Sequence, residues 1–176
     1  AGVTIGPVTS RAHFDKVMGY IELAKSEGGR VLTGGNAVQP PGRCESGWFI
    51  APTVIENLGP HTRTNTEEIF GPVVTLQPFE DEEEAVRLGN DVAYGLVAGV
   101  WTKSIGRAIR MSKALHVGTV WVNTYRTYSY MVPFGGFKRS GIGRESGIEA
   151  VDEFLETKSV LISAVESAPA NAFVMR

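Results

Sequence analysis

The chain has 176 residues, of which 43% are hydrophobic and 20% are charged, and its formal net charge is -2. This size and composition are typical of one soluble globular domain, and the small charge gives no electrostatic attraction for nucleic acid or an anionic membrane. No apolar run approaches the roughly 20 residues of a membrane-spanning helix. The single cysteine, Cys44, excludes an intrachain disulfide and a cysteine-based metal site. We therefore expect a cytoplasmic protein with no nucleic-acid partner, no membrane partner and no metal.

The first expected element is an amphipathic helix between about residues 10 and 26. Phe14, Val17 and Ile21 recur at helical spacing, and Gly28 lies just beyond the run. The preceding stretch AGVTIGPVTS has no initiator Met and is typical of a loop inside a protein. We therefore expect the chain to be part of a longer polypeptide.

A loop rich in Gly and Pro follows at residues 34–47, and a strand-like run follows it at residues 48–58. Pro52 interrupts that run, which predicts a break or an edge because proline cannot donate a ladder hydrogen bond.

Short apolar runs at residues 73–80, 96–102 and 118–123 are each compatible with a strand buried on both faces. Helical patterns separate them at residues 80–90 and 104–115. In the first helix Asp81 can cap the start, and in the second Ile105, Ala108, Ile109, Ser112 and Leu115 form the expected inward stripe. This alternation predicts a βαβαβ unit, and therefore an α/β fold with an open, mostly parallel sheet and flanking helices.

The C-terminal part has helical spacing at residues 144–156 and alternates as a strand at residues 157–164. Because the chain offers that strand no later partner, we expect it to join the sheet of another subunit and so to make a homo-oligomer. Residues 165–176 have no firm pattern and are expected to be a tail.

The most glycine-rich stretch is PFGGFKRSGIGRESG at residues 133–147. It matches neither the dinucleotide-binding fingerprint nor the P-loop, because its glycines are spaced differently and no strand leads directly into it. From the residues alone, we expect these glycines to permit tight backbone geometry. Lys138, Arg139 and Arg144 are then either solvated or capping.

The same stretch nevertheless resembles the C-terminal signature of the NAD(P)-dependent aldehyde dehydrogenase superfamily. Four upstream segments are similar to that family in the same order: GPVTSRAHFDKV (6–17), EEIFGPV (67–73), NDVAYGL (90–96) and GTVWVN (118–123). The resemblance implies that residues 1–156 are the C-terminal portion of the catalytic domain of an enzyme that oxidises an aldehyde to a carboxylic acid. It also implies NAD or NADP as cofactor.

The resemblance implies no catalytic residue in this chain. The family's nucleophilic cysteine lies in a G-Q-x-C context and its general-base glutamate in an E-L-G-G context, and neither motif occurs here. Cys44 lies in the Gly- and Pro-rich loop with no base patterned beside it, so we do not assign it as the nucleophile. The isolated chain is expected to be inactive, and a non-catalytic oligomerisation or interaction module is the alternative.

Two cofactor-binding residues are implied by the match at EEIFGPV. Glu68 corresponds to the glutamate whose carboxylate accepts hydrogen bonds from the nicotinamide ribose, and Phe70 corresponds to the aromatic residue near the nicotinamide ring. The alternatives are a solvated acid and a core aromatic side chain.

The segment after WVN corresponds to the loop that lines the aldehyde tunnel of the family. The substrate-pocket residues implied are Arg126, Thr127, Tyr128 and Phe134. Arg126 is also a candidate for attracting a carboxylate-bearing semialdehyde, with simple solvation as the alternative.

Arg144 and Glu156 match in type and position a charged pair that braces the subunit-contact region in the family. The three tryptophans, Trp48, Trp101 and Trp121, lie in strand-like runs and are expected in the core.

Overall fold

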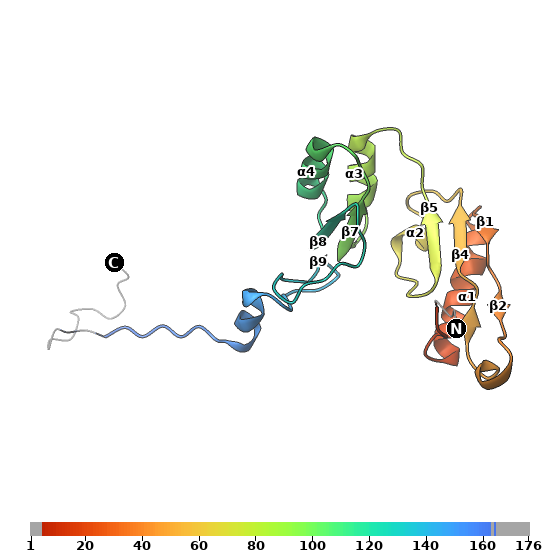
Figure 1. Ribbon diagram of the computed structural model, residues 1–176, viewed down its shortest axis with the longest axis horizontal. Coiled ribbons are helices and arrows are strands. Elements are labelled where there is room, and N and C mark those ends of the chain that lie inside the picture. The colour runs from red at the N-terminus through yellow and green to blue at the C-terminus, as the bar shows by residue number, and fades with distance from the viewer. Residues whose placement is uncertain (1–4, 163, 165–176) are drawn as a thin grey trace, which may run out of the picture.

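The computed structural model describes residues 5–162 and residue 164. They form two lobes joined by the connection at residues 77–81, and the C-terminal segment extends away from both lobes (Figure 1). Helices and strands alternate in both lobes and the sheets are mixed, so the fold is α/β. Within the described residues, no helix has both the length and the apolar character needed to cross a membrane.

The first lobe contains a helix packed on a three-stranded sheet, together with a small hairpin. Its elements are α1 (Arg11–Ser26), β1 (Arg30–Thr33), β2 (Ala37–Val38), η1 (Gly42–Cys44), β3 (Phe49–Ile50), β4 (Thr53–Glu56), α2 (Arg63–Thr66) and β5 (Val73–Leu76). The sheet order is β1-β4-β5, with β1 antiparallel and β5 parallel to β4. The break between β3 and β4 includes Pro52 and confirms the predicted interruption.

The core of the first lobe lies between α1 and the strands. Val17, Ile21 and Ala24 of α1 are fully buried, and they pack near Ile50 and Ile55. The helix begins where predicted, because the Ser10 hydroxyl accepts a hydrogen bond from its third backbone N–H. The expected amphipathic helix is therefore confirmed.

The second lobe has two helices over two short strand pairs. Its elements are α3 (Glu82–Asn90), β6 (Tyr94–Gly95), β7 (Val97–Val100), α4 (Ile105–Ala114), β8 (Thr119–Val122) and β9 (Phe137–Lys138). Strands β7 and β8, which precede and follow α4 in the chain, pair with each other in parallel. Strands β6 and β9 pair antiparallel. The predicted cap is present, since the Asp81 carboxylate accepts a hydrogen bond of 2.8 Å from the backbone of Glu84.

The three apolar runs predicted a single βαβαβ sheet, and this prediction is wrong in one respect. Strand β5 pairs with β4 in the first lobe, and the described residues form no ladder between β5 and β7. The parallel β7-β8 pair with its connecting helix is the part that is confirmed. Strand β5 is also not buried on both faces, because Val74 and Leu76 are half exposed. Apolar runs indicate strands, but they do not specify which strand each one pairs with.

Much apolar surface remains uncovered. On α4 the predicted stripe is buried only at Ala108 and Leu115, while Ile105 is 77% exposed. Trp101, expected in the core, is 65% exposed, whereas Trp121 is buried as predicted. These faces lack the covering that apolar strands and helices normally have.

The C-terminal region contains one 3₁₀ helix, η2 (Ile148–Phe154), followed by extended chain. Residues 157–162 form no ladder with any other described residue, so the strand expected at 157–164 has no partner within the described part of this chain. The predicted tail at 165–176 lies outside the described residues. The domain boundaries expected at residues 156 and 164 remain predictions.

A glycine contact between α1 and the start of β5 gives a stability prediction. A Cβ atom at Gly71 would lie 2.6 Å from Val17 Cγ2, in the tightly packed core. Gly71→Ala should therefore reduce the free energy of unfolding by about 1–3 kcal/mol. Urea denaturation followed by circular dichroism measures the change.

The control is Gly19→Ala on the exposed side of α1, where nothing lies within 4 Å of the added methyl group. It should increase stability by up to about 1 kcal/mol, because alanine favours the helix. Equal effects of the two substitutions would contradict the packing argument.

Candidate functional site

One face of α1 holds the loop that carries Glu68 and Phe70. The loop connects α2 to β5 and is bound at three points. His13 Nε2 donates to the Phe70 carbonyl at 2.6 Å, and Lys16 Nζ donates to the Glu68 carbonyl at 2.9 Å. In the third contact, the Tyr20 hydroxyl donates a hydrogen bond to Glu67 Oε2 at 2.5 Å. Residues three and four positions apart share one face of a helix, so one helix positions the whole loop.

The two adjacent glutamates of this loop have different surroundings. The Glu67 carboxylate accepts hydrogen bonds from Arg63 Nε at 2.8 Å and Arg63 Nη2 at 2.9 Å, in addition to Tyr20. These bonds, Arg63 first and Tyr20 second, hold the pKa of the Glu67 carboxyl at about 2, well below its usual range. The Glu68 carboxylate is exposed and forms no hydrogen bond or ion pair with any described residue. Glu67 therefore anchors the loop, whereas the Glu68 carboxylate has no partner among the described residues.

Phe70 has an unusual backbone that presents its ring to solvent. Its φ is 58°, in the left-handed region, and 71% of the residue is exposed. A bulky residue in this conformation costs about 1–2 kcal/mol and persists only where its surroundings hold it. The ring lies 5.8 Å from the His13 ring, centroid to centroid. Phe70 is therefore not a core side chain of the described part of this chain.

A second group of predicted residues lies in the second lobe. The loop after β8 folds back on that strand and borders an open hollow of about 630 Å³. Thr127, Tyr128 and Phe134 are among the residues that line it, so the structure brings together three of the four predicted pocket residues.

Aromatic contacts shape that hollow. The Tyr128 ring meets Trp121 edge-on at 5.5 Å and Phe134 at 5.3 Å, centroid to centroid. Trp121 Nε1 donates to the Thr127 carbonyl at 2.9 Å, and the backbone of Phe134 pairs with that of Glu145. Edge-on aromatic pairs of this kind fix the rings relative to one another. The aromatic part of the wall is therefore held in place at both ends, beside polar lining residues such as Ser129 and Glu145.

Arg126 differs from its three neighbours. It does not belong to the set of residues that line the hollow, and its guanidinium lies over the Tyr125 ring at 5.6 Å from the centroid. Its side chain is exposed. The structure thus separates Arg126 from the pocket residues with which the sequence grouped it.

The glycine-rich stretch packs backbone against backbone. A Cβ atom on Gly118 would overlap the Gly135 carbonyl, and one on Gly135 would lie 2.5 Å from the Gly143 carbonyl oxygen. The predicted structural use of these glycines is confirmed. Lys138 caps, as expected, by donating to the carbonyls of Asn90 and Val92.

The predicted pair of Arg144 and Glu156 is not formed among the described contacts. The guanidinium of Arg144 instead donates to the Gly136 carbonyl at 3.1 Å and the Gly143 carbonyl at 2.6 Å. Its backbone N–H donates to the Glu153 carboxylate at 3.3 Å. Arg144 turns inward because the carbonyls of the tight glycine-rich loop need donors.

The chain is similar to known proteins over nearly its whole length. The model of the aldehyde dehydrogenase family matches residues 1–160. This chain belongs to the aldehyde dehydrogenase family.

Two relatives illustrate the similarity of sequence within the aldehyde dehydrogenases. An aldehyde dehydrogenase of Aspergillus niger is 48% identical over 155 residues, which are 88% of this chain and 30% of the relative. One from Deinococcus radiodurans is 43% identical over 162 residues, which are 92% of this chain and 31% of the relative. The chain therefore spans about a third of the length of the curated relatives that it matches.

Solved aldehyde dehydrogenases have the same fold as this chain. Betaine aldehyde dehydrogenase from Staphylococcus aureus, in complex with NAD+, is 42% identical, with a TM-score of 0.86, over 99% of this chain and 34% of that protein. Indole-3-acetaldehyde dehydrogenase AldA of P. syringae, a mutant in complex with NAD+ and IAA, is 35% identical, with a TM-score of 0.84, over 90% of this chain and 31% of that protein.

The sequence did not indicate which three α1 residues hold the loop of this aldehyde dehydrogenase chain. These residues are His13, Lys16 and Tyr20. Their spacing was the available signal, because polar residues at 13, 16 and 20 lie on one face beside the buried Val17. Periodicity reveals such a face but not the loop that it binds.

The different roles of the two glutamates predict different effects on stability at neutral pH. Glu67→Gln should destabilise the chain, because it removes the carboxylate that binds Arg63 and Tyr20. Glu68→Gln is the matched control and should leave the urea midpoint unchanged.

The effect of Glu67→Gln should also depend on pH. The folded pKa of Glu67 is about 2, below its ordinary value of 4.5, so its contribution is full above pH 4.5 and is lost as the pH falls through about 2. The difference in urea midpoint between wild type and Glu67→Gln should therefore shrink over that interval. A difference that is constant with pH would contradict the assignment.

Proposed function

We propose that this chain is the C-terminal catalytic-domain portion of an enzyme that oxidises an aldehyde to a carboxylic acid with NAD or NADP. One observation carries the proposal: Glu68 presents a free carboxylate and Phe70 an exposed ring from a single anchored loop. Similar solved proteins, a betaine aldehyde dehydrogenase and an indole-3-acetaldehyde dehydrogenase, were determined with NAD+.

The two residues fit the nicotinamide end of such a cofactor. A carboxylate without partners accepts two hydroxyl hydrogen bonds, which vicinal ribose hydroxyls supply, and charge-assisted bonds of this kind are the strong ones. An exposed aromatic face fits a flat heteroaromatic ring. When bound, NAD(P)+ supplies the hydride acceptor, and the role of these residues is to orient it.

The nucleophile and the general base are proposed to come from a part of the enzyme outside these residues. Cys44 belongs to η1 in the first lobe, whereas the aromatic hollow is in the second lobe. The described residues also hold no cluster of three or more side chains able to bind a metal ion. On this proposal the chain on its own is inactive.

The aromatic hollow is proposed to form one wall of the aldehyde site. Thr127, Tyr128 and Phe134 line it, and its volume of about 630 Å³ is in the range of small-molecule sites. Arg126 is proposed to lie at the rim, where its charge reaches only a substrate that extends out of the hollow.

The segment at residues 157–164 is proposed to add to the sheet of a second copy and so to make a homo-oligomer. Its support is that Val160, Leu161 and Ile162 are extended, unpaired within the described part of the chain and between 71% and 93% exposed. Extended apolar segments with free backbone groups readily pair with another strand.

The first test measures cofactor binding in a full-length aldehyde dehydrogenase that contains this segment. Glu68→Gln should raise the dissociation constant for NADH by about tenfold, because the ribose hydroxyls lose a charged acceptor. Fluorescence titration measures it, with Glu83→Gln, another exposed glutamate, as control.

The same test includes the isolated 176-residue chain mixed with aldehyde and NAD+, which should form no NADH. NADH formation by the chain alone, or an unchanged affinity in Glu68→Gln, would contradict the proposal.

The second test compares how substitutions at Tyr128 and Arg126 change the KM for an aldehyde. In the full-length enzyme Tyr128→Ala should raise the KM for an apolar aldehyde by about tenfold, since it removes one aromatic wall of the pocket. Arg126→Ala should leave that KM within about twofold, because its side chain is exposed outside the hollow. Steady-state kinetics measure both, and the reverse ranking would rule out the hollow as the aldehyde site.

A further inference from the structure

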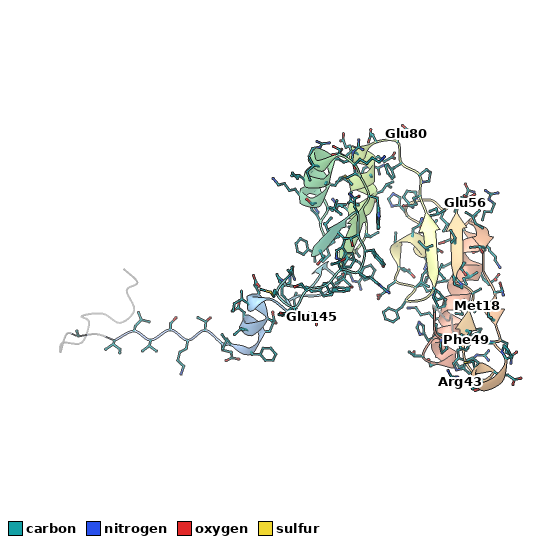
Figure 2. All side chains as sticks on the ribbon, viewed as in Figure 1. Met18, Arg43, Phe49, Glu56, Glu80 and Glu145 are labelled. Carbon is teal, nitrogen blue, oxygen red and sulfur yellow. The ribbon has the colours of Figure 1, made fainter. Side chains whose placement is uncertain are left out.

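We propose that Lys138 is a positioning residue for the aromatic hollow, because it clamps the glycine-rich stretch that carries Phe134 onto the second lobe. This inference rests on the proposed function, in which the hollow forms one wall of the aldehyde site, and it extends that function to a residue outside the lining. Figure 2 labels Glu145, which borders the hollow where the chain leaves the second lobe toward η2. Lys138 holds the same stretch before that point, in β9.

The side chain of Lys138 reaches from β9 to the C-terminal end of α3. Its Nζ donates to the Asn90 carbonyl at 2.8 Å and to the Val92 carbonyl at 3.1 Å. The last carbonyls of a helix have no partners within the helix, and the helix dipole favours a cation beside them. One ammonium group therefore joins segments that are 48 and 46 residues apart in the chain.

The residues after Lys138 continue the same attachment. The backbone N–H of Arg139 donates to the Ala93 carbonyl at 2.9 Å, and the Ser140 hydroxyl accepts from the backbone N–H of Gly95 at 2.9 Å. Strand β9 also pairs with β6. Because β9 is only two residues long, this ladder is short, and the side chains of Lys138 and Ser140 add to the attachment.

Lys138 has a strained backbone. Its φ is 54°, in the left-handed region that residues other than glycine rarely adopt. Residues strained in this way persist where neighbouring groups over-determine their conformation. The pairing with β6 and the two carbonyl contacts supply that constraint. Lys138 is therefore a point at which the glycine-rich stretch is held against its own preference.

Asn90 extends the connection from Lys138 to the strand that lines the hollow. The Asn90 side chain donates from Nδ2 to the Ala114 carbonyl at 2.8 Å, and its Oδ1 accepts from the backbone N–H of His116 at 2.7 Å. Ala114 ends α4, and His116 lies in the connection from α4 to β8. Strand β8 contributes to the lining of the hollow. Lys138 is thus tied to the segment that leads into the opposite side of the hollow.

Phe134 depends on such a clamp because two glycines follow it. Gly135 and Gly136 separate Phe134 from β9, and glycine has the greatest backbone freedom of any residue. In its other long-range backbone contact, Phe134 pairs with Glu145. The Phe134 ring meets the Tyr128 ring at 5.3 Å, centroid to centroid. Without the clamp at β9, the Phe134 ring is free to move away from Tyr128 and widen the hollow.

Close packing of Gly135 on Gly118 would also hold this segment, and it predicts different results. If that packing suffices, loss of the Lys138 ammonium should lower at most the melting temperature and leave the KM for an aldehyde unchanged. If Lys138 positions Phe134, its loss should raise that KM only while the Phe134 ring is present. A double-mutant cycle separates the two explanations.

The experiment uses a full-length aldehyde dehydrogenase that contains this segment and measures KM and kcat with hexanal as the apolar aldehyde, together with the dissociation constant for NADH. Lys138→Met should raise the KM about fivefold and leave kcat and NADH affinity within about twofold of wild type. Lys138→Arg, which keeps charged donors, should leave the KM within about twofold.

Two further variants complete the experiment. Adding Lys138→Met to Phe134→Ala should cause no further rise in KM. Lys103→Met is the matched control, because the Lys103 side chain is exposed and forms no hydrogen bond or ion pair with any residue that the structure describes.

The outcomes distinguish failure of the inference from failure of the proposed function. An unchanged KM in Lys138→Met, an equal rise in Lys138→Arg, or a rise that persists without the Phe134 ring overturns the inference, and the proposed function stands if Phe134→Ala raises the KM. An unchanged KM in both Phe134→Ala and Tyr128→Ala overturns the hollow as the aldehyde site and this inference with it.

A second variant at the same position applies if Lys138→Met does not fold. Lys138→Gly also removes the donor, but glycine adopts a φ of 54° without strain. Its KM for hexanal should be about fivefold higher than that of wild type. An unchanged KM in Lys138→Gly overturns the inference.

Discussion

The burial of α1 against the first sheet is the contact on which the rest of the first lobe depends. Val17 and Ile21 are fully buried beneath the strands, and burying each aliphatic side chain of this size contributes about 1.5–3 kcal/mol. Because the inner face of the helix is fixed in this way, its neighbouring polar face is fixed too. The loop between α2 and β5 therefore receives its donors from a rigid element, which is what a binding site requires.

The two lobes contribute different kinds of surface. The first offers a carboxylate and a ring from an anchored loop, which suits a polar cofactor. The second offers a hollow with edge-on aromatic rings, which suits an apolar ligand. Much apolar surface around them is bare, including Ile105 of α4, and the chain spans about a third of its relatives. A shared explanation is that these faces pack on other parts of a complete aldehyde dehydrogenase.

Local structure was predicted well from the sequence because its causes are local. The Ser10 and Asp81 caps, the buried stripe of α1 and the break at Pro52 follow from hydrogen bonding and periodicity within a few residues. Family resemblance supplied the candidate residues, and three of the four pocket residues line one hollow. Strand partners were not predictable in the same way, and β5 was assigned to the wrong sheet. Pairing depends on contacts between distant segments.

The contacts of individual side chains also could not be predicted from the sequence. Arg144 was expected to pair with Glu156 but turns to the carbonyls of its own loop, because the folded glycine backbone creates acceptors that composition does not reveal. Trp101 looks like a core residue in a strand and is exposed, since nothing in the described chain covers it. The contrasting roles of Glu67 and Glu68 likewise depend on where Arg63 and Tyr20 lie in space.

The different roles of Glu67 and Glu68 constrain the length of the connection between α2 and β5. Because α2 ends at Thr66 and Glu67 follows it directly, inserting one residue there would place Glu67 where Glu68 now lies, and the acid now bound by Arg63 would become the free one. The composition of the segment would hardly change, yet the present arrangement of one bound and one free carboxylate would be lost. Spacing, more than residue content, is therefore what this short connection must preserve.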